Sequence, residues 1–193
     1  MKLYHTSHQI IRQPDVNYGR RNADFGGGFY LAESRDFAER WASEQKDEKT
    51  YVNIYELDLT GLNVVTLTRD AEWVEYIFKN RNGFADSKAD ADVIIGPIAN
   101  DTIYDTYGII GSGLLKNDTA LALLQLGPCY RQIAVKTEKA ASQLKWLFAD
   151  ELSHSSIAAF RTTVRNEERE YRELFASTLE TLPEFAEIDE MLG

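Results

Sequence analysis

The chain contains 193 residues, 44% of them hydrophobic, and carries a formal net charge of −10. This length suits one ordinary domain with a sizeable core, and the acidic balance argues against broad electrostatic binding to nucleic acid, because phosphate contacts require Lys or Arg. No apolar run reaches the roughly 18–20 residues of a membrane span and the N-terminus lacks a signal-peptide pattern, so we expect a cytoplasmic protein that does not bind membranes.

Apolar spacing and turn residues predict alternating short strands and helices. Ser34 and Thr137 are good helix N-caps, and Pro97 should end a buried strand because proline cannot donate to a central ladder. The predicted strands are 2–5, 28–32, 51–59, Val64-Val65, 92–98 and 131–136, and the predicted helices are 35–45, 70–81, 100–110, 117–126, 137–148 and 154–181.

Charge and cysteine content add two expectations. Residues 150–193 hold eleven acidic residues against four arginines, so −7 of the net charge lies in this predicted helical extension, where Tyr171, Phe175 and Leu179 form an apolar stripe. We expect the stripe to pack on the domain, with partner binding or self-association as the alternative. The single cysteine, Cys129, cannot form an internal disulfide and is expected to be a buried structural thiol.

A glycine turn is the strongest functional signal. Gly26-Gly27-Gly28 removes side chains that would hold a ligand away from the backbone, and it leads directly into Phe29-Tyr30. An aromatic ring that directly follows such a turn offers a flat, electron-rich face to a cationic heterocycle. The alternative is that Tyr30 simply fills the core. Arginines 12, 20 and 21 lie just before the turn, where they could hold an anionic ligand or remain a solvated surface.

Several motifs resemble one family. His5-Thr6-Ser7, the strand Gly28-Phe29-Tyr30-Leu31-Ala32 and the helix from Ser34 to Trp41 look like the first two motifs of ADP-ribosyltransferases of the His-Tyr-Glu type. More specifically, the chain is similar to a branch of small bacterial proteins of that superfamily with an Asp-Phe-Gly-x-Gly-Phe-Tyr signature, here beginning at Asp24. Segments from Val93 to Asp101 and from Gln132 to Ala140 extend the resemblance, which covers about residues 3–148.

The resemblance implies an α+β fold, with two small, roughly perpendicular β-sheets flanked by helices and NAD, as co-substrate, held between them. It assigns residues 1–150 to this domain and 151–193 to an acidic helical extension. His5 would bind the adenosine-side ribose, Tyr30 would stack on nicotinamide, and Gln132 would stand where relatives have the catalytic glutamate. The predicted catalytic residues are His5, Tyr30 and Gln132, and the predicted NAD-binding residues are His5, Thr6, Ser7, Arg20, Asp24, Gly28, Phe29 and Tyr30; no metal site is expected.

The implied function is an NAD-dependent mono-ADP-ribosyltransferase that modifies a macromolecular acceptor, in the manner of a toxin-like effector controlled by an antitoxin partner. Gln132 is a neutral amide and offers no full negative charge to the cation that develops as nicotinamide departs. Asp24, Glu33 or Asp101 could supply that charge, and Asp24 is preferred because it adjoins the turn. Two alternatives are a catalytically weak NAD- or nucleotide-binding module and an interaction scaffold that binds through its C-terminal helix.

Overall fold

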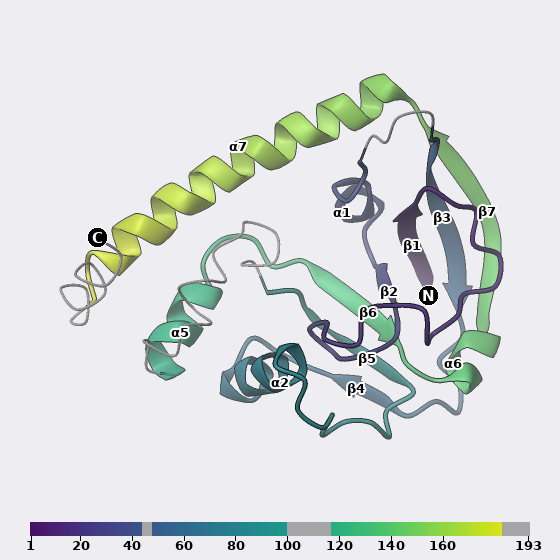
Figure 1. Cartoon of the computed structure of the whole chain (residues 1–193), viewed down its shortest axis with the longest axis horizontal. Coiled ribbons are helices and arrows are strands. Elements are labelled where there is room, and N and C mark those ends of the chain that lie inside the picture. The colour runs from purple at the N-terminus through teal and green to yellow at the C-terminus, as the bar shows by residue number, and fades with distance from the viewer. Residues whose placement is uncertain (44–47, 100–116, 183–193) are drawn as a thin grey trace.

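The fold of the computed structural model, which describes residues 1–43, 48–99 and 117–182, is α+β (Figure 1). Its strands form one mixed seven-stranded sheet in the order β4-β5-β6-β2-β1-β3-β7. The strands are β1 Lys2–Ser7, β2 Phe29–Ala32, β3 Thr50–Leu57, β4 Val64–Thr66, β5 Val93–Pro97, β6 Arg131–Val135 and β7 Leu144–Leu152. The helices in the described part of the chain are α1 Arg35–Glu39, α2 Ala71–Arg81, α5 Asn117–Leu124, α6 Glu138–Ser142 and α7 His154–Leu179.

The sheet consists of two strand groups that meet at a narrow seam. β1 pairs with β3 from Lys2 to Ser7, and β2 pairs with β6 along its whole length, but the ladder between β1 and β2 records one residue pair, Tyr4 with Ala32. Figure 1 shows β1, β3 and β7 running together on one side and β4, β5 and β6 on the other. Beyond Tyr4, β1 diverges from β2 and leaves space between the groups.

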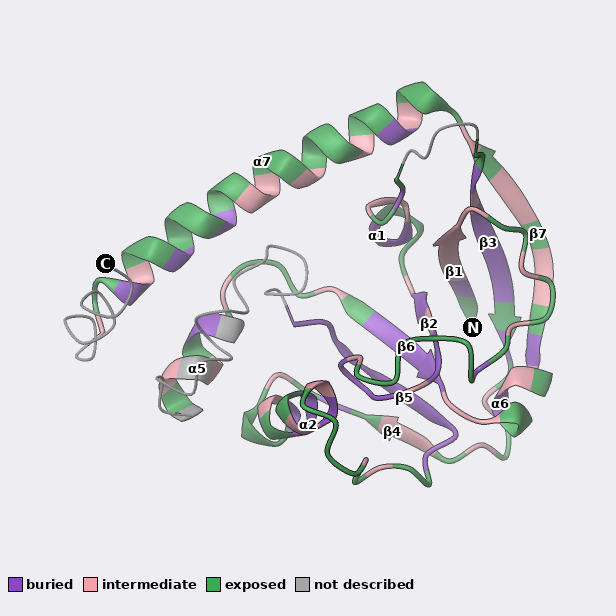
Figure 2. Ribbon diagram, in the orientation of Figure 1, coloured by how far each residue is buried: buried purple, intermediate pink, exposed green. Residues whose placement is uncertain are grey.

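Buried side chains cover both faces of the sheet, and β6 shows why. Ile133 and Val135 enter one core cluster and Ala134 enters another, because successive strand residues point to opposite faces. α2 covers the second face with Trp73 and Ile77, which are buried with Ala134. Asp70 caps this helix by accepting a hydrogen bond from the Trp73 amide at 3.0 Å. Figure 2 shows the buried residues concentrated along β3, β5 and β6.

Most of the predicted elements in the described ranges are confirmed within a few residues. The caps are confirmed as well: Ser34 accepts from the Phe37 amide at 3.3 Å, and Thr137 accepts from the Ala140 amide at 3.2 Å. The predicted helix over 100–110 lies outside the described residues.

The prediction of one helix from 137 to 148 is wrong beyond residue 142. α6 ends at Ser142, and Leu144–Leu152 forms the edge strand β7, antiparallel to β3. The register passes from Ile54 opposite Phe148 to Tyr55 opposite Trp146, which leaves Leu147 as the extra residue of a bulge. A bulge shifts the alternation by one residue, so the apolar residues 144, 147 and 148 fall at a helical spacing although they belong to a strand.

Two positions with sequence patterns typical of the core are not buried: Cys129, and Trp41, which recurs with Phe37, Ala38 and Ala42 at helical spacing. Cys129 is exposed, in the connection between α5 and β6. Trp41 is 47% exposed, because α1 ends at Glu39 and the chain continues through tighter bonds, such as the Trp41 amide to the Ala38 carbonyl at 3.2 Å. The Ala38 carbonyl also accepts from the Thr6 hydroxyl at 2.5 Å, so this end of α1 is tied to β1.

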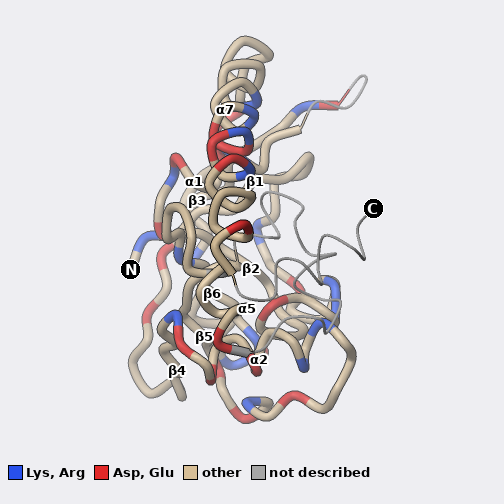
Figure 3. Tube along the Cα trace, turned by 90° about the vertical axis from the view of Figure 1, so that its left-hand side faces the viewer, with Lys and Arg blue, Asp and Glu red and all other residues tan. Residues whose placement is uncertain are grey.

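α7 confirms the predicted terminal helix and extends along one side of the molecule (Figure 1). Tyr171, Phe175 and Leu179 are buried, as expected for a stripe that packs on the protein, and α7 contacts α5. Arg40 pairs with Glu167 and thereby joins α1 to α7. Figure 3 shows both acidic and basic residues along the helix. No helix among the described residues is long and apolar enough to cross a membrane.

Candidate functional site

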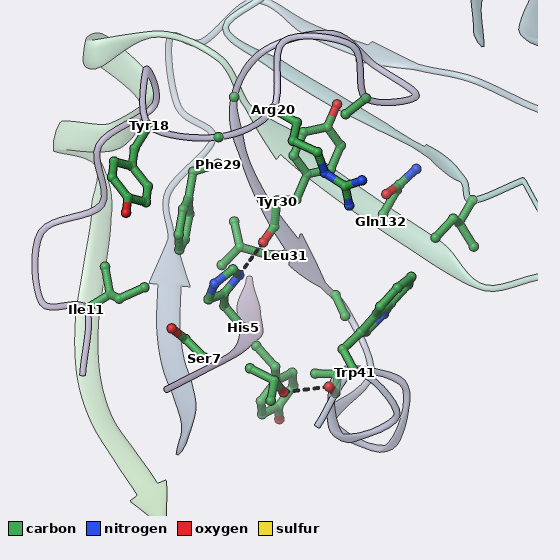
Figure 4. Close-up of a pocket in the computed structure, with 18 of the residues that line it drawn as sticks. His5, Ser7, Ile11, Tyr18, Arg20, Phe29, Tyr30, Leu31, Trp41 and Gln132 are labelled. Atoms are coloured by element: carbon green, nitrogen blue, oxygen red, sulfur yellow. Dashed lines mark hydrogen bonds between the residues drawn. The ribbon is translucent and has the colours of Figure 1, made fainter. Parts of the chain in front are cut away.

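A cavity of about 910 Å³ lies at the seam between the two strand groups (Figure 4). This volume is within the range of roughly 300–1,000 Å³ that small-molecule and cofactor sites occupy. In Figure 4, His5 lies between a wall that contains Ile11, Tyr18 and Phe29 and a wall that contains Arg20, Trp41 and Gln132. Every predicted site residue borders this cavity: His5, Thr6, Ser7, Arg20, Asp24, Gly28, Phe29, Tyr30 and Gln132.

Two residues of the glycine turn adopt backbone angles that favour glycine, and one of them, Gly28, borders the cavity. Gly26 has φ of 76° and Gly28 has φ of 153°. A Cβ on Gly28 would also lie 2.8 Å from the Val135 carbonyl oxygen, so β2 can approach β6 only without a side chain here. Gly27 has open space around its missing Cβ. The turn therefore serves strand packing at Gly28, a residue that also borders the cavity.

The Tyr30 hydroxyl closes the glycine turn. It accepts a hydrogen bond from the Phe25 amide at 2.9 Å and donates one to the Gly26 carbonyl at 2.7 Å. Burial, followed by the negative charge of Asp24, raises the pKa of Tyr30 well above its ordinary value, so the hydroxyl keeps its proton. The ring stacks loosely on Phe25 and borders the cavity. Tyr30 thus has a structural bond to the turn that the sequence did not indicate.

His5 is held as a neutral imidazole. Its Nδ1 lies 2.7 Å from the Tyr30 carbonyl oxygen, which can only accept, so Nδ1 carries the proton and Nε2 is the acceptor nitrogen. The ring packs on Phe29 with 4.5 Å between centroids. Burial lowers the pKa of His5, and the bond to Tyr30 only partly opposes that shift. The imidazole also gives the Tyr30 carbonyl a partner where β1 and β2 no longer pair.

Acid should destabilise the protein through His5. The unfolded chain takes up a proton near the ordinary histidine pKa of about 6.5, whereas the folded protein resists protonation until a lower pH. Stability attributable to His5 is therefore present above about pH 6.5 and is lost as the pH falls through the folded pKa. Urea denaturation from pH 7.5 to 5 should show a steeper loss for the wild type than for His5→Asn. Parallel curves would contradict this assignment.

Asp24, Arg81 and Gln132 form a buried polar cluster at one side of the cavity. The Arg81 guanidinium binds one Asp24 oxygen, with Nε at 2.8 Å and a terminal nitrogen at 2.7 Å. The other Asp24 oxygen accepts from Gln132 Nε2 at 3.0 Å and from the Ala99 amide at 3.3 Å. The preferred source of negative charge is therefore next to Gln132, as the sequence suggested, but a cation is paired with it. A glutamate at 132 would bring two carboxylates together, which an amide avoids.

The remaining predicted residues are placed as follows. Thr6 directs its hydroxyl to the Ala38 carbonyl on α1. The Ser7 hydroxyl accepts from the Gln9 amide at 3.2 Å, and Arg20 is exposed at the cavity edge. Of the other proposed carboxylates, Glu33 lies 3.8 Å from Arg131, and Asp101 is outside the described residues.

Several residues that border the cavity were not singled out by their sequence pattern, among them Trp41, Tyr18 and Arg81. Trp41 and Tyr18 border the cavity with exposed rings, 47% and 89% accessible respectively, and Arg81 borders it while bound to Asp24. The spacing of Trp41 matched a buried helical face, so the sequence favoured the core. Nothing local to Arg81 signals a partner 57 positions away. Among the residues whose positions are described, no group of His, Cys, Asp and Glu has the arrangement of a metal site.

Comparison with known proteins places the chain in a family without giving it an activity. No curated protein and no solved structure gave a significant match. The family described as Protein of unknown function (DUF3990) matches residues 1–146. This range includes β1 to β6, the first part of β7 and every residue that borders the cavity. The chain therefore belongs to the DUF3990 family.

Proposed function

We propose that the protein is an NAD-dependent mono-ADP-ribosyltransferase with a macromolecular acceptor and an ADP-ribosyltransferase-like fold. One observation carries the proposal: the nine residues expected at an NAD site come from β1, the loop and glycine turn that lead into β2, β2 itself, and β6, and all border one cavity. The two strand groups that meet at the seam would correspond to the two sheets of such a fold. These residues were chosen from the sequence alone. If the choice had no relation to a binding site, we would not expect all of them to border the same cavity.

The polar groups suit the two ends of an extended dinucleotide. Nε2 of the neutral His5 can accept a hydrogen bond from a ribose hydroxyl. Arg20 is exposed at the cavity edge, where it can pair with a pyrophosphate. The Thr6 hydroxyl bonds to α1 instead of pointing along the edge of β1 that does not pair with β2. This edge of the backbone is therefore open to the carboxamide of nicotinamide.

The aromatic groups suit the nicotinamide. Trp41 presents an exposed ring to the cavity, and Tyr30 presents a ring whose position is fixed by the glycine turn. In transfer, the bond between ribose C1′ and the nicotinamide nitrogen breaks, and its electron pair leaves with nicotinamide. Gln132 donates from Nε2 to Asp24, so its Oε1 is the atom that would interact with the positive charge that develops in transfer.

Removal of Trp41 should weaken NAD binding without unfolding the protein. The ring is 47% exposed, so Trp41→Ala costs little packing and removes a stacking surface worth roughly 1–3 kcal/mol per ring by analogy with base stacking. We expect the NAD dissociation constant, measured by calorimetry, to rise about 5- to 150-fold, the equivalent of that energy. Phe84→Ala is the matched control, because Phe84 is 61% exposed and does not border the cavity.

Transfer itself is tested by incubating the protein with labelled NAD and a cell lysate. The proposal expects release of nicotinamide and attachment of label to protein. Wild-type protein that neither binds NAD nor releases nicotinamide would overturn it, and equal losses for Trp41→Ala and Phe84→Ala would remove Trp41 from the site.

A catalytically weak NAD-binding module is the second candidate. The specific observation in its favour is that Gln132 is neutral and that the neighbouring Asp24 is paired with Arg81. Saturable NAD binding with no release of nicotinamide would favour this candidate over the transferase.

A further inference from the structure

A second histidine, His8, borders the same cavity, and the groups around it determine which of its ring nitrogens carries the proton. His8 follows β1, and its Nδ1 lies 3.3 Å from the Lys49 carbonyl oxygen. A carbonyl only accepts, and Thr50 Oγ1, which lies 3.4 Å from Nδ1, donates its own proton to the Ser43 carbonyl. The Nδ1 atom therefore carries the proton, and Nε2 is the basic nitrogen. Ser43 Oγ lies 3.2 Å from that Nε2 and donates to it. The Glu48 carboxylate lies 3.8 Å from Nδ1, and both His8 and Glu48 border the cavity.

This arrangement has the parts of a general base. The Ser43 hydroxyl donates to the basic nitrogen of His8, and the Lys49 carbonyl binds the other ring nitrogen. The Glu48 carboxylate is close enough to stabilise the imidazolium once it forms. The side chain of His8 is 23% exposed, so it stays accessible to a hydroxyl that comes from outside. Ser43 therefore marks a position that an acceptor hydroxyl can take.

The centre of the cavity does not offer an equivalent base among its described residues. Gln132 is an amide, Asp24 is paired with Arg81, and the raised pKa of Tyr30 keeps its hydroxyl protonated. His5 has its acceptor nitrogen assigned to the ribose. Asp15 borders the cavity as well, but its Oδ1 accepts from the Asn17 amide, and a carboxylate is a weaker base toward a hydroxyl than imidazole.

We propose that His8 is the catalytic base of the transfer and that the acceptor group is a hydroxyl. The acceptor hydroxyl displaces Ser43 from His8 Nε2. Its oxygen forms a bond to ribose C1′, its proton passes to Nε2, and the bond between C1′ and nicotinamide breaks with the electron pair leaving on nicotinamide. Glu48 balances the charge of the imidazolium. This inference rests on the proposed transferase function.

The test uses the full-length protein, NAD and methanol as a small hydroxyl probe. His8→Asn should lower the rate of methyl ADP-ribose formation by about 100-fold or more, the usual range for loss of a general base, while the NAD dissociation constant stays unchanged. His154→Asn is the matched control, since it makes the same substitution at the start of α7. Label transferred to lysate protein should survive neutral hydroxylamine, which cleaves esters but not O-glycosides.

The outcomes separate this inference from the function on which it rests. Wild-type turnover that His8→Asn leaves intact, or protein label that hydroxylamine removes, would overturn the base or the hydroxyl acceptor while the transferase stands. Wild-type protein without NAD binding or nicotinamide release would overturn both.

Discussion

Arg81→Met is expected to lower the free energy of unfolding by about 3–5 kcal/mol, the usual cost of leaving one member of a buried ion pair without its partner. The Arg81 and Asp24 side chains are only 12% and 7% exposed, and each of two guanidinium nitrogens lies within 2.8 Å of Asp24 Oδ1. Without Arg81, the Asp24 carboxylate would depend on Gln132 and the Ala99 amide. Urea denaturation at pH 7 measures the loss.

Lys79 offers a control on the same helix. It forms an exposed pair with Glu75, and Lys79→Met should change stability by about 0.5 kcal/mol or less. The double variant Asp24→Asn/Arg81→Met should recover part of the loss, because it removes the uncompensated charge. If Arg81→Met were no worse than Lys79→Met, the cluster would not be a buried ion pair in solution.

Gly28→Ala should destabilise the protein by at least about 1–3 kcal/mol, the cost of holding a residue in a sparsely populated backbone region. Its φ of 153° suits glycine, and the added Cβ would lie 2.8 Å from the Val135 carbonyl oxygen. The obstacle is backbone, so it cannot move aside as a flexible side chain would. Separation of β2 from β6 would also displace Phe29 and Tyr30, and NAD binding should fall with stability.

Gly27→Ala tests whether the turn depends on the close strand contact at Gly28 or on the flexibility of glycine throughout the turn. A Cβ at Gly27 meets nothing within 4 Å, so this variant should match the wild type or gain up to about 1 kcal/mol through a less flexible unfolded chain. Thermal unfolding of the two variants side by side provides the comparison. Similar losses at both positions would mean that flexibility of the whole turn, rather than strand contact at Gly28, is what matters.

The sequence predicted elements whose signals are local. The alternation of β6 and the caps at Ser34 and Thr137 were readable because each depends on a few neighbouring residues. β7 was not, because the bulge at Leu147 depends on pairing with β3, about 90 positions earlier, and disguises the strand alternation. The exposure of Trp41 depends on where α1 ends, and that end is tied to Thr6.

The same distinction applies to the site. Residues such as His5 and Tyr30 could be named from motifs, and the nine residues predicted as catalytic or NAD-binding all border the cavity. Their individual roles could not be predicted, because the partners are distant in sequence. Gln132 reaches Asp24 across 108 positions, and Arg81 reaches it from α2. Motifs therefore located the cavity, whereas the charge balance inside it followed only from the tertiary contacts.

The narrow seam gives ligand binding a mechanical consequence. Besides the Tyr4–Ala32 pair, His5 joins the two strand groups through the Tyr30 carbonyl, and Thr6 joins β1 to α1, the helix that follows β2. A dinucleotide that contacts both His5 and Gln132 would act as a further cross-link between the groups. The seam could then open only when the ligand dissociates, so the two processes would be coupled. Amide hydrogen exchange along β1 and β2 should therefore slow as the ligand concentration rises above its dissociation constant.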